Sequence, residues 1–190
     1  MVIAITGKSG SGKSTLVNNF VKKHKDYHKI IPYTTRPKRP LEQDGIDYHF
    51  VSNDEITRED DLILRSIYNG WRYAIDKKDI FKESKKSIGV FTPADIRRLK
   101  QLGGKVVSVY IYSDDRTNVM RALERGDNIV EVFRRYLTDL GQFDGFVYES
   151  DICIGSPNRC MPQMLLSDLE TELYKIKDYR DNEWKELEWK

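Results

Sequence analysis

A short glycine-rich stretch near the start of the chain has the residue types and the spacing of a phosphate-binding loop. It reads Gly7-x-x-x-x-Gly12-Lys13-Ser14, the pattern of a P-loop. Glycine lets backbone N–H groups approach an anion, the lysine ammonium reaches the β- and γ-phosphates, and the serine hydroxyl binds Mg²⁺. Lys13 is therefore the predicted catalytic residue, and Ser14 the predicted ligand of an Mg²⁺ cofactor. The predicted ATP-binding residues are Gly7, Ser9, Gly10, Ser11, Gly12, Lys13, Ser14 and Thr15.

The segments on either side of this loop are those that a phosphate-binding loop needs. Residues 2–5 form a continuous apolar run, which is typical of a strand buried on both faces of a parallel sheet. After the loop, Leu16, Val17 and Phe20 share one face of a helix, whose positive N-terminal end then points into the loop. A Gly/Ser-rich surface turn is the alternative, but the flanking strand and helix favour the nucleotide site.

The composition limits the possible compartments and partners. The chain has 190 residues, 33% of them charged, and a net charge of only +2, so it lacks the strong positive field of nucleic-acid binders. Cys153 and Cys160 lack metal-type spacing, and no apolar run is long enough to cross a bilayer. The first strand begins at residue 2, which leaves no room for a signal peptide. We expect a cytoplasmic monomer or homodimer that binds neither nucleic acid nor membrane.

Residues 33–75 predict a small β-rich insertion in a chain that otherwise alternates strands and helices. Residues 33–40 are too rich in proline for a helix and too basic for a core, so they should lie on the surface. Two strand-like segments, 62–68 and 71–75, are separated by Asn69-Gly70, which is a strong signal for a β-hairpin with a type I′ turn.

Outside the insertion, apolar periodicity predicts an α/β fold with about five parallel strands and flanking helices. The expected strands are 2–5, 30–31, 87–91, 106–112 and either 146–148 or 152–154. Helices are expected after the first strand, from Pro93 to Leu102, from residue 114 or 115 to Arg125, around residues 130–140, and from Pro162 onward.

Two motifs together resemble the guanylate kinase family. Besides the loop, the chain contains Tyr33-Thr34-Thr35-Arg36-Pro37-Lys38-Arg39, followed by Glu42, Gly45 and Asp47-Tyr48-His49-Phe50-Val51-Ser52. This is similar to the T-T-R-x-x-R…E-x-x-G-x-D-Y-x-F-V-S segment of that family, and the resemblance runs from residue 1 to about residue 155. It implies a single P-loop kinase domain with three parts. These are a core of residues 1–32, 76–113 and 136–190, a monophosphate-binding subdomain of residues 33–75, and a mobile helical lid of about residues 114–135.

The resemblance implies that Arg36, Arg39 and Tyr48 hold the phosphate of the acceptor. Guanidinium groups match phosphate oxygens two at a time, and a tyrosine hydroxyl adds a neutral donor. A solvated basic loop is the alternative for the two arginines. The hairpin resembles the family's G-x-x-Y-G stretch through Gly70 and Tyr73. Tyr73 is accordingly either a second phosphate donor or a half-buried aromatic residue of the strand.

Three further arginines, Arg121, Arg125 and Arg135, resemble those that clamp the transferring phosphoryl group in the family. Arg121 and Arg125 are one helical turn apart and share a face. The alternative is ordinary surface ion pairing with nearby carboxylates, namely Glu124, Asp127 or Glu131. Phosphoryl transfer requires positive charge around three equatorial oxygens, so the set as a whole favours a catalytic role.

The chain departs from the family at the positions that read guanine. Leu64 stands where the family has a glutamate, and Ile75 stands where it has a serine. Val90 and Thr92 replace the family's D-x-D pair. We therefore expect a weaker preference for GMP than in the family, or a preference for another base. A carboxylate elsewhere, from Asp60, Asp61 or Asp95, is the alternative source of guanine recognition.

The resulting prediction is an enzyme that transfers the γ-phosphoryl group of ATP to a nucleoside or deoxynucleoside monophosphate. Leu64 and Ile75 complete the predicted substrate-binding set of Arg36, Arg39, Tyr48 and Tyr73. One alternative is an interaction module that keeps the fold without catalysis, and another is a small-molecule kinase with a non-nucleotide acceptor. The retained Lys13 and Ser14 favour the enzyme.

Overall fold

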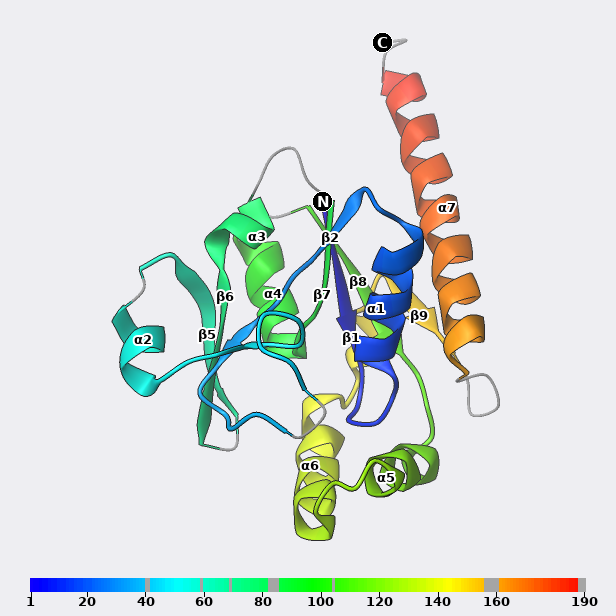
Figure 1. The fold of residues 1–190 in the computed structure, drawn as a ribbon. Helices are drawn as coiled ribbons and strands as arrows, with labels where there is room; N and C mark the ends of the chain where they lie inside the picture. Colours follow the sequence, from blue (N-terminus) through cyan, green and yellow to red (C-terminus); the bar gives the residue numbers. More distant parts are fainter. Residues whose placement is uncertain are drawn as a thin grey trace. The chain divides into compact units, whose positions relative to one another are not determined.

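Five strands form a parallel sheet in the order β2-β7-β1-β8-β9 (Figure 1). The computed structural model describes residues 1–39, 42–58, 60–68, 70–81, 86–103, 105–155 and 161–187. The strands are β1 (Val2–Thr6), β2 (Tyr27–Lys29), β7 (Lys86–Val90), β8 (Val106–Ile111) and β9 (Ile152–Ile154). Every residue of β1 and β8 is buried, as the continuous apolar runs predicted.

One expected core strand is wrong, and one open choice is resolved. The strand expected at 30–31 is β2, at Tyr27–Lys29. Ile30 is buried and still donates its N–H to the carbonyl of Ile88, but it lies outside the strand. β2 is an edge strand of half-buried polar residues, which apolar periodicity does not detect. At the other edge of the sheet the strand is β9, and Phe146–Tyr148 form a short 3₁₀ helix.

The chain divides into two compact units. The first unit comprises Met1–Ile5 and Val21–Ser108, and the second comprises Thr6–Phe20 and Val109–Lys190. The phosphate-binding loop belongs to the second unit. The β-rich insertion belongs to the first.

The insertion in the first unit is a four-stranded sheet in the order β4-β3-β6-β5. Its strands are β3 (Tyr33–Thr34), β4 (His49–Phe50), β5 (Leu62–Tyr68) and β6 (Trp71–Asp76). β5 and β6 pair as the predicted antiparallel hairpin, whose turn residue Asn69 lies outside the described residues. The helix α2 (Asn53–Arg58) packs its Ile56 against Leu62 and Ala74. The first unit also contains α3 (Lys77–Phe81) and α4 (Pro93–Gln101).

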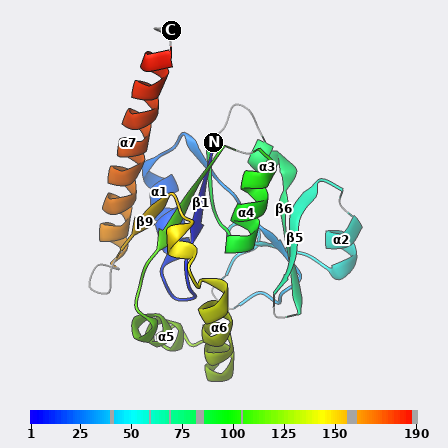
Figure 2. The same ribbon diagram turned by 180° about the vertical axis from the view of Figure 1, so that it is seen from behind.

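The second unit arranges its helices around the loop that follows β1. These helices are α1 (Lys13–Lys23), whose last residues lie in the first unit, α5 (Asp115–Glu124), α6 (Ile129–Gln142) and α7 (Pro162–Leu187). Asp114 and Asn128 cap the N-termini of α5 and α6 through their side chains. Only a short connection, residues 125–128, separates the two helices. α7 lies beside α1 and β9, with Leu165 and Leu169 buried (Figure 2). In the described part of the chain, no helix has the length and apolar composition that a membrane span requires.

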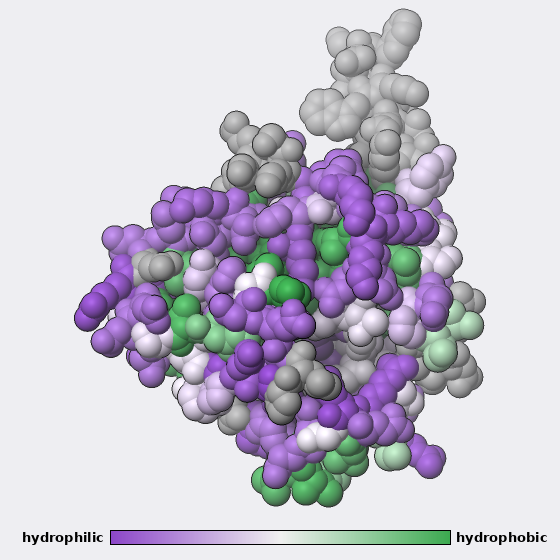
Figure 3. All heavy atoms as spheres, in the orientation of Figure 1, coloured by the Kyte–Doolittle hydropathy of each residue, from purple (hydrophilic) through white to green (hydrophobic). Residues whose placement is uncertain are grey.

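The helix α6 turns a mixed side inward and leaves its apolar stripe outside. Its buried residues are Val132 and the carboxylate-bearing Asp139. Its apolar stripe is exposed to solvent and consists of Val130, Phe133, Leu137 and Leu140. Green spheres at the lower edge of Figure 3, over α5 and α6, show apolar side chains on this part of the surface. Apolar periodicity therefore identified the helix, but its buried side is the one that faces the phosphate-binding loop.

Candidate active site

The glycines of the loop permit an approach to α5 that no other residue allows. Gly10 has a φ of +84°, in the left-handed region. A Cβ atom at Gly10 would clash with the carbonyl oxygen of Asn118. On the other side of the loop, a Cβ atom at Gly7 would lie 2.8 Å from the carbonyl oxygen of Ile111. The loop is thus held against β8 and α5 by contacts that require glycine.

Lys13 begins α1 and turns back toward the loop. Its ammonium donates to the carbonyl oxygens of Gly7, at 2.6 Å, and Lys8, at 2.8 Å. Burial lowers the pKa of Lys13 from 10.5 to about 8, opposed by the charge of Asp139 and reinforced by those of Arg125 and Arg135. A lysine with this pKa is charged at neutral pH but loses its proton in mildly alkaline solution.

This pKa predicts that ATP affinity falls as the pH rises above 8. Below pH 7 the ammonium of Lys13 is already protonated, so affinity is flat there. Above pH 8 the protein must take up a proton to bind the phosphates, and the dissociation constant rises by up to about tenfold per pH unit. Isothermal titration of ATP between pH 6.5 and 9.5 measures this. A Lys13→Arg control keeps its charge and is expected to stay flat, and an equally flat wild-type profile contradicts the assignment.

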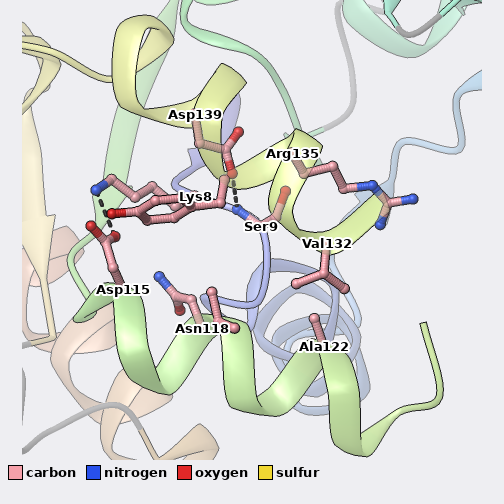
Figure 4. Close-up of a pocket in the computed structure, with 10 residues that line it drawn as sticks. Lys8, Ser9, Asp115, Asn118, Ala122, Val132, Arg135 and Asp139 are labelled. Atoms are coloured by element: carbon pink, nitrogen blue, oxygen red, sulfur yellow. Dashed lines mark hydrogen bonds and ion pairs between the residues drawn. The ribbon is translucent and has the colours of Figure 1, made fainter. Parts of the chain in front are cut away.

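Three contacts connect the loop to α5 and α6, as Figure 4 shows for two of them. The ammonium of Lys8 lies 2.6 Å from the carboxylate of Asp115. The backbone N–H of Ser9 donates to the carboxylate of Asp139 at 2.6 Å. Arg121 extends its guanidinium to the carbonyl oxygen of Gly10 at 3.5 Å. Both helices therefore supply charged groups to the mouth of the loop.

The other two predicted arginines of this region meet at one carboxylate. Arg125 donates to Asp127 at 3.1 Å, and Arg135 donates to the same carboxylate at 3.2 Å. Glu131 accepts from Arg134 and Arg135, and these hydrogen bonds lower the pKa of Glu131 to about 2. The ion pairs weighed as an alternative are present for Arg125 and Arg135. They also hold these arginines in defined positions beside the loop.

A pocket open to solvent lies between the loop, α5 and α6 (Figure 4). Ser9, Arg135, Asn118 and Asp139 are among its lining residues. Asn118 is 4% exposed, and its Oδ1 accepts from the hydroxyl of Ser113 at 2.8 Å. Within the described residues, its Nδ2 has no hydrogen-bond partner. The buried hydroxyls of Thr6, at the end of β1, and Ser11, in the loop, also have no hydrogen-bond partner among the described residues. Buried polar groups are normally paired, so the Nδ2 of Asn118, a residue that lines the pocket, is a donor that a ligand there could use.

The donor set suits an Mg²⁺ ion that arrives with its nucleotide. Ser14 is the second residue of α1 and its side chain is exposed, so its hydroxyl is accessible to a cation. The described residues contain no cluster of three or more His, Cys, Asp or Glu that could hold a metal alone. Mg²⁺ is commonly bound through substrate phosphates and few protein ligands, which matches a single hydroxyl.

In the first unit, the four residues predicted to bind the acceptor phosphate form a cluster with Glu42. The carboxylate of Glu42 accepts from Arg36 at 2.7 and 3.0 Å and from the backbone N–H of Arg39 at 2.9 Å. The guanidinium of Arg36 lies 5.2 Å from the ring centroid of Tyr48, whose ring is 6.2 Å from that of Tyr73. Residues up to 37 positions apart in sequence, from Arg36 to Tyr73, thus form one cluster.

The charges of this cluster keep its donors protonated. Burial alone lowers the pKa of Arg36, but the hydrogen bonds and charge of Glu42 hold that pKa above its ordinary value. Burial and the nearby Tyr73 raise the pKa of Tyr48, so its hydroxyl remains a donor. Sequence reasoning gave Glu42 no role. Glu42 stands in the family-like segment quoted from the sequence, and that motif was the signal that could have pointed to this contact.

The two apolar residues at the positions predicted to contact the base are buried in the hairpin. Leu64 is 4% exposed and has a φ of +51°, in a register shift of β5 between Ile63 and Ser66. Ile75 is 5% exposed and lies two residues after Tyr73, on the same side of β6.

Two of the carboxylates considered as replacements already have partners. Asp95 accepts from the hydroxyl of Thr92 at 2.7 Å in the capping box of α4, and burial raises the pKa of its carboxyl. Asp61 pairs with Lys78 at 3.3 Å and is largely exposed. Asp60 is exposed in the turn before β5. The most buried of the three, Asp95, therefore serves helix capping.

The family model that matches this chain is that of guanylate kinase, and the curated relatives that match it include guanylate kinases. The family model for guanylate kinase matches residues 1–151. The guanylate kinase of Pseudoalteromonas translucida is 31% identical over 136 residues, which are 67% of this chain and 66% of that protein. The guanylate kinase of Caulobacter vibrioides is 32% identical over 146 residues, or 73% and 68% of the two chains.

Solved structures agree on the fold. The guanylate kinase of Anaplasma phagocytophilum superposes with a TM-score of 0.65 at 17% identity, covering 96% of this chain and 85% of that one. A gluconokinase from Sinorhizobium meliloti gives a TM-score of 0.58 at 13% identity, covering 96% of both chains. At such identities the likeness concerns the fold alone.

Proposed function

The chain belongs to the guanylate kinase family, and we propose that it transfers the γ-phosphoryl group of ATP to a nucleoside or deoxynucleoside monophosphate. One observation carries the proposal. The chain combines a complete P-loop, including Lys13 and Ser14, with the Arg36, Arg39, Tyr48 and Tyr73 cluster around Glu42. The first set suits a triphosphate and the second suits a monophosphate group.

On the ATP side, the work of the protein is electrostatic. Lys13 and the loop N–H groups bind the β- and γ-phosphates, and Arg121, Arg125 and Arg135 surround the transferring group with positive charge. When bound, Mg²⁺ neutralises charge on the phosphate oxygens, with Ser14 as its protein ligand. Closure of α5 and α6 over the loop would exclude water, which otherwise competes as an acceptor.

On the acceptor side, the Glu42 cluster orients the attacking phosphate. The guanidinium of Arg36 is fixed by Glu42, so it presents its remaining N–H groups to phosphate oxygens with little loss of side-chain entropy. Arg39 adds a second positive charge, and Tyr48 and Tyr73 add hydroxyl donors. The acceptor phosphate needs no general base of high pKa, because its oxygen is already anionic near neutral pH.

The base specificity is proposed to differ from that of the family. The N1–H and N2–H₂ donors of guanine need acceptors, which Leu64 and Ile75 lack, and a buried donor without an acceptor costs about 1–3 kcal/mol. We expect GMP or dGMP to be preferred over other monophosphates by much less than a hundredfold. The measurement is kcat/KM for GMP, dGMP, AMP, dTMP, dCMP and dUMP. A preference of about a hundredfold or more for the guanine nucleotides contradicts this.

A variant sharpens that comparison. Ile75→Ser places a hydroxyl beside Tyr73 on β6 and is expected to raise kcat/KM for GMP relative to dTMP. Ile67→Ser, on the exposed side chain of β5, is the matched control and is expected to leave the ratio unchanged.

Two other functions are tested by the same assay. An interaction module without catalysis would release no ADP with any acceptor, and a small-molecule kinase would release ADP only with a non-nucleotide acceptor. The paired arginines around Glu42 favour an acceptor that carries a phosphate. ADP release that depends on a nucleoside monophosphate supports the proposal.

A further inference from the structure

One carboxylate lies where the phosphate-binding loop should bind an anion. Asp139 is 5% exposed on the inward side of α6, and its Oδ2 accepts the backbone N–H of Ser9 at 2.6 Å. A carboxylate oxygen and a phosphate oxygen each accept a short charge-assisted hydrogen bond from an N–H group. Figure 4 shows this contact in the pocket between the loop and the two helices.

The surroundings of Asp139 are those of an anion site. Lys8 and Arg135 line the same pocket, and Lys13 lies close enough for the charge of Asp139 to act on it. Asn118 also lines this pocket, and its buried Nδ2 has no hydrogen-bond partner among the described residues. Hydrogen-bond donors and positive charges therefore surround the carboxylate of Asp139 where it contacts the loop.

We propose that Asp139 is a built-in competitor for the phosphate groups of ATP, holding the N–H of Ser9 until a phosphate oxygen replaces it. This inference rests on the proposed binding of ATP by the loop. The phosphates and Asp139 carry the same sign of charge and use the same donor, so both cannot remain there together. Binding of the nucleotide consequently releases α6 from the loop.

Release of Asp139 also affects Arg135. The two residues are one turn apart on the inward side of α6, so they move together with the helix. Arg135 is held by Asp127 and Glu131, both on the lid segment itself, and it can shift with that segment. The competitor therefore couples ATP binding to the position of a proposed catalytic arginine.

The test is the affinity for Mg²⁺-ATP of Asp139→Asn, measured by isothermal titration without any acceptor. Asparagine keeps the shape and an oxygen acceptor for Ser9 but removes the charge. We expect about tenfold tighter binding or more. The titration is run at pH 6.5, where Lys13 stays protonated in both proteins, because loss of the Asp139 charge lowers the pKa of Lys13 further. Glu124→Gln removes one exposed charge from α5, outside the pocket, and is expected to bind as the wild type does.

Binding by Asp139→Asn that is unchanged or weaker than in the wild type overturns the inference. A second measurement needs no variant. In the wild-type protein, the amide resonance of Ser9 and the carboxyl carbon resonance of Asp139 are both expected to shift on addition of Mg²⁺-ATP. If Asp139 stays unchanged while Lys13 and the loop respond, the inference fails.

These outcomes are separate from those that concern the proposed function. Tighter binding by Asp139→Asn in a protein that transfers no phosphate to any monophosphate contradicts the function and supports the competitor. Normal phosphoryl transfer, with the same ATP affinity in Asp139→Asn as in the wild type, supports the proposed function and contradicts the competitor role of Asp139.

Discussion

Replacing Lys13 with alanine is expected to lower kcat for phosphoryl transfer by about a hundredfold to a thousandfold, the usual effect of removing one donor that stabilises transition-state charge. The ammonium is partly buried in the loop, and burial lowers its pKa, so water weakens its attraction for the phosphates less than at an exposed site. Steady-state kinetics with saturating ATP and acceptor measure the change.

The fold is expected to survive this substitution, since the bonds of Lys13 go to carbonyl oxygens of the loop and not to the core. Lys22→Ala, on the exposed end of the same helix, controls for the loss of one positive charge and is expected to be active. A folded Lys13→Ala protein with wild-type turnover would refute the role of the loop.

Arg36→Met is expected to lower kcat/KM for the acceptor by about a hundredfold or more while the KM for ATP stays nearly unchanged. Two charge-assisted hydrogen bonds to phosphate are lost, each worth about 1.5–3 kcal/mol. The ATP-binding residues belong to a different set, so this loss is confined to the acceptor.

The substitution also leaves Glu42 without its main partner. The Arg36 and Glu42 side chains are 11% and 15% exposed, so we expect the free energy of unfolding to fall by about 1–3 kcal/mol. Chemical denaturation measures this separately from the kinetics. Arg58→Met, at an exposed ion pair of α2, is the control and is expected to change neither quantity. Equal losses of kcat/KM in both variants would contradict a specific role for Arg36.

The parts of the site that could be predicted from sequence are those whose residues are close together in the chain. The loop, the strand before it and the helix after it need only local rules of glycine geometry and apolar periodicity. Arg36, Arg39, Tyr48 and Tyr73 were assigned by resemblance, and the structure brings them into one cluster. The roles of these residues remain predictions until activity is measured.

The residues that sequence reasoning missed lie in tertiary contacts. Asp139 is four residues after Arg135, so helical spacing could have placed both on one face of α6. The apolar stripe of Val130, Phe133, Leu137 and Leu140 instead favoured burial of the opposite face, but that face is exposed. Periodicity shows that a helix has two unlike faces, but which face meets the rest of the chain depends on what it packs against.

Transfer of label from ATP carrying a labelled γ-phosphate is the most direct test of the central claim. The protein is incubated with Mg²⁺, the labelled ATP and a mixture of ribonucleoside and deoxyribonucleoside monophosphates, and the products are separated. We expect label in one or more nucleoside diphosphates in the wild type and almost none in Lys13→Ala and Arg36→Met. Label found only in inorganic phosphate, or retained in ATP, would contradict it.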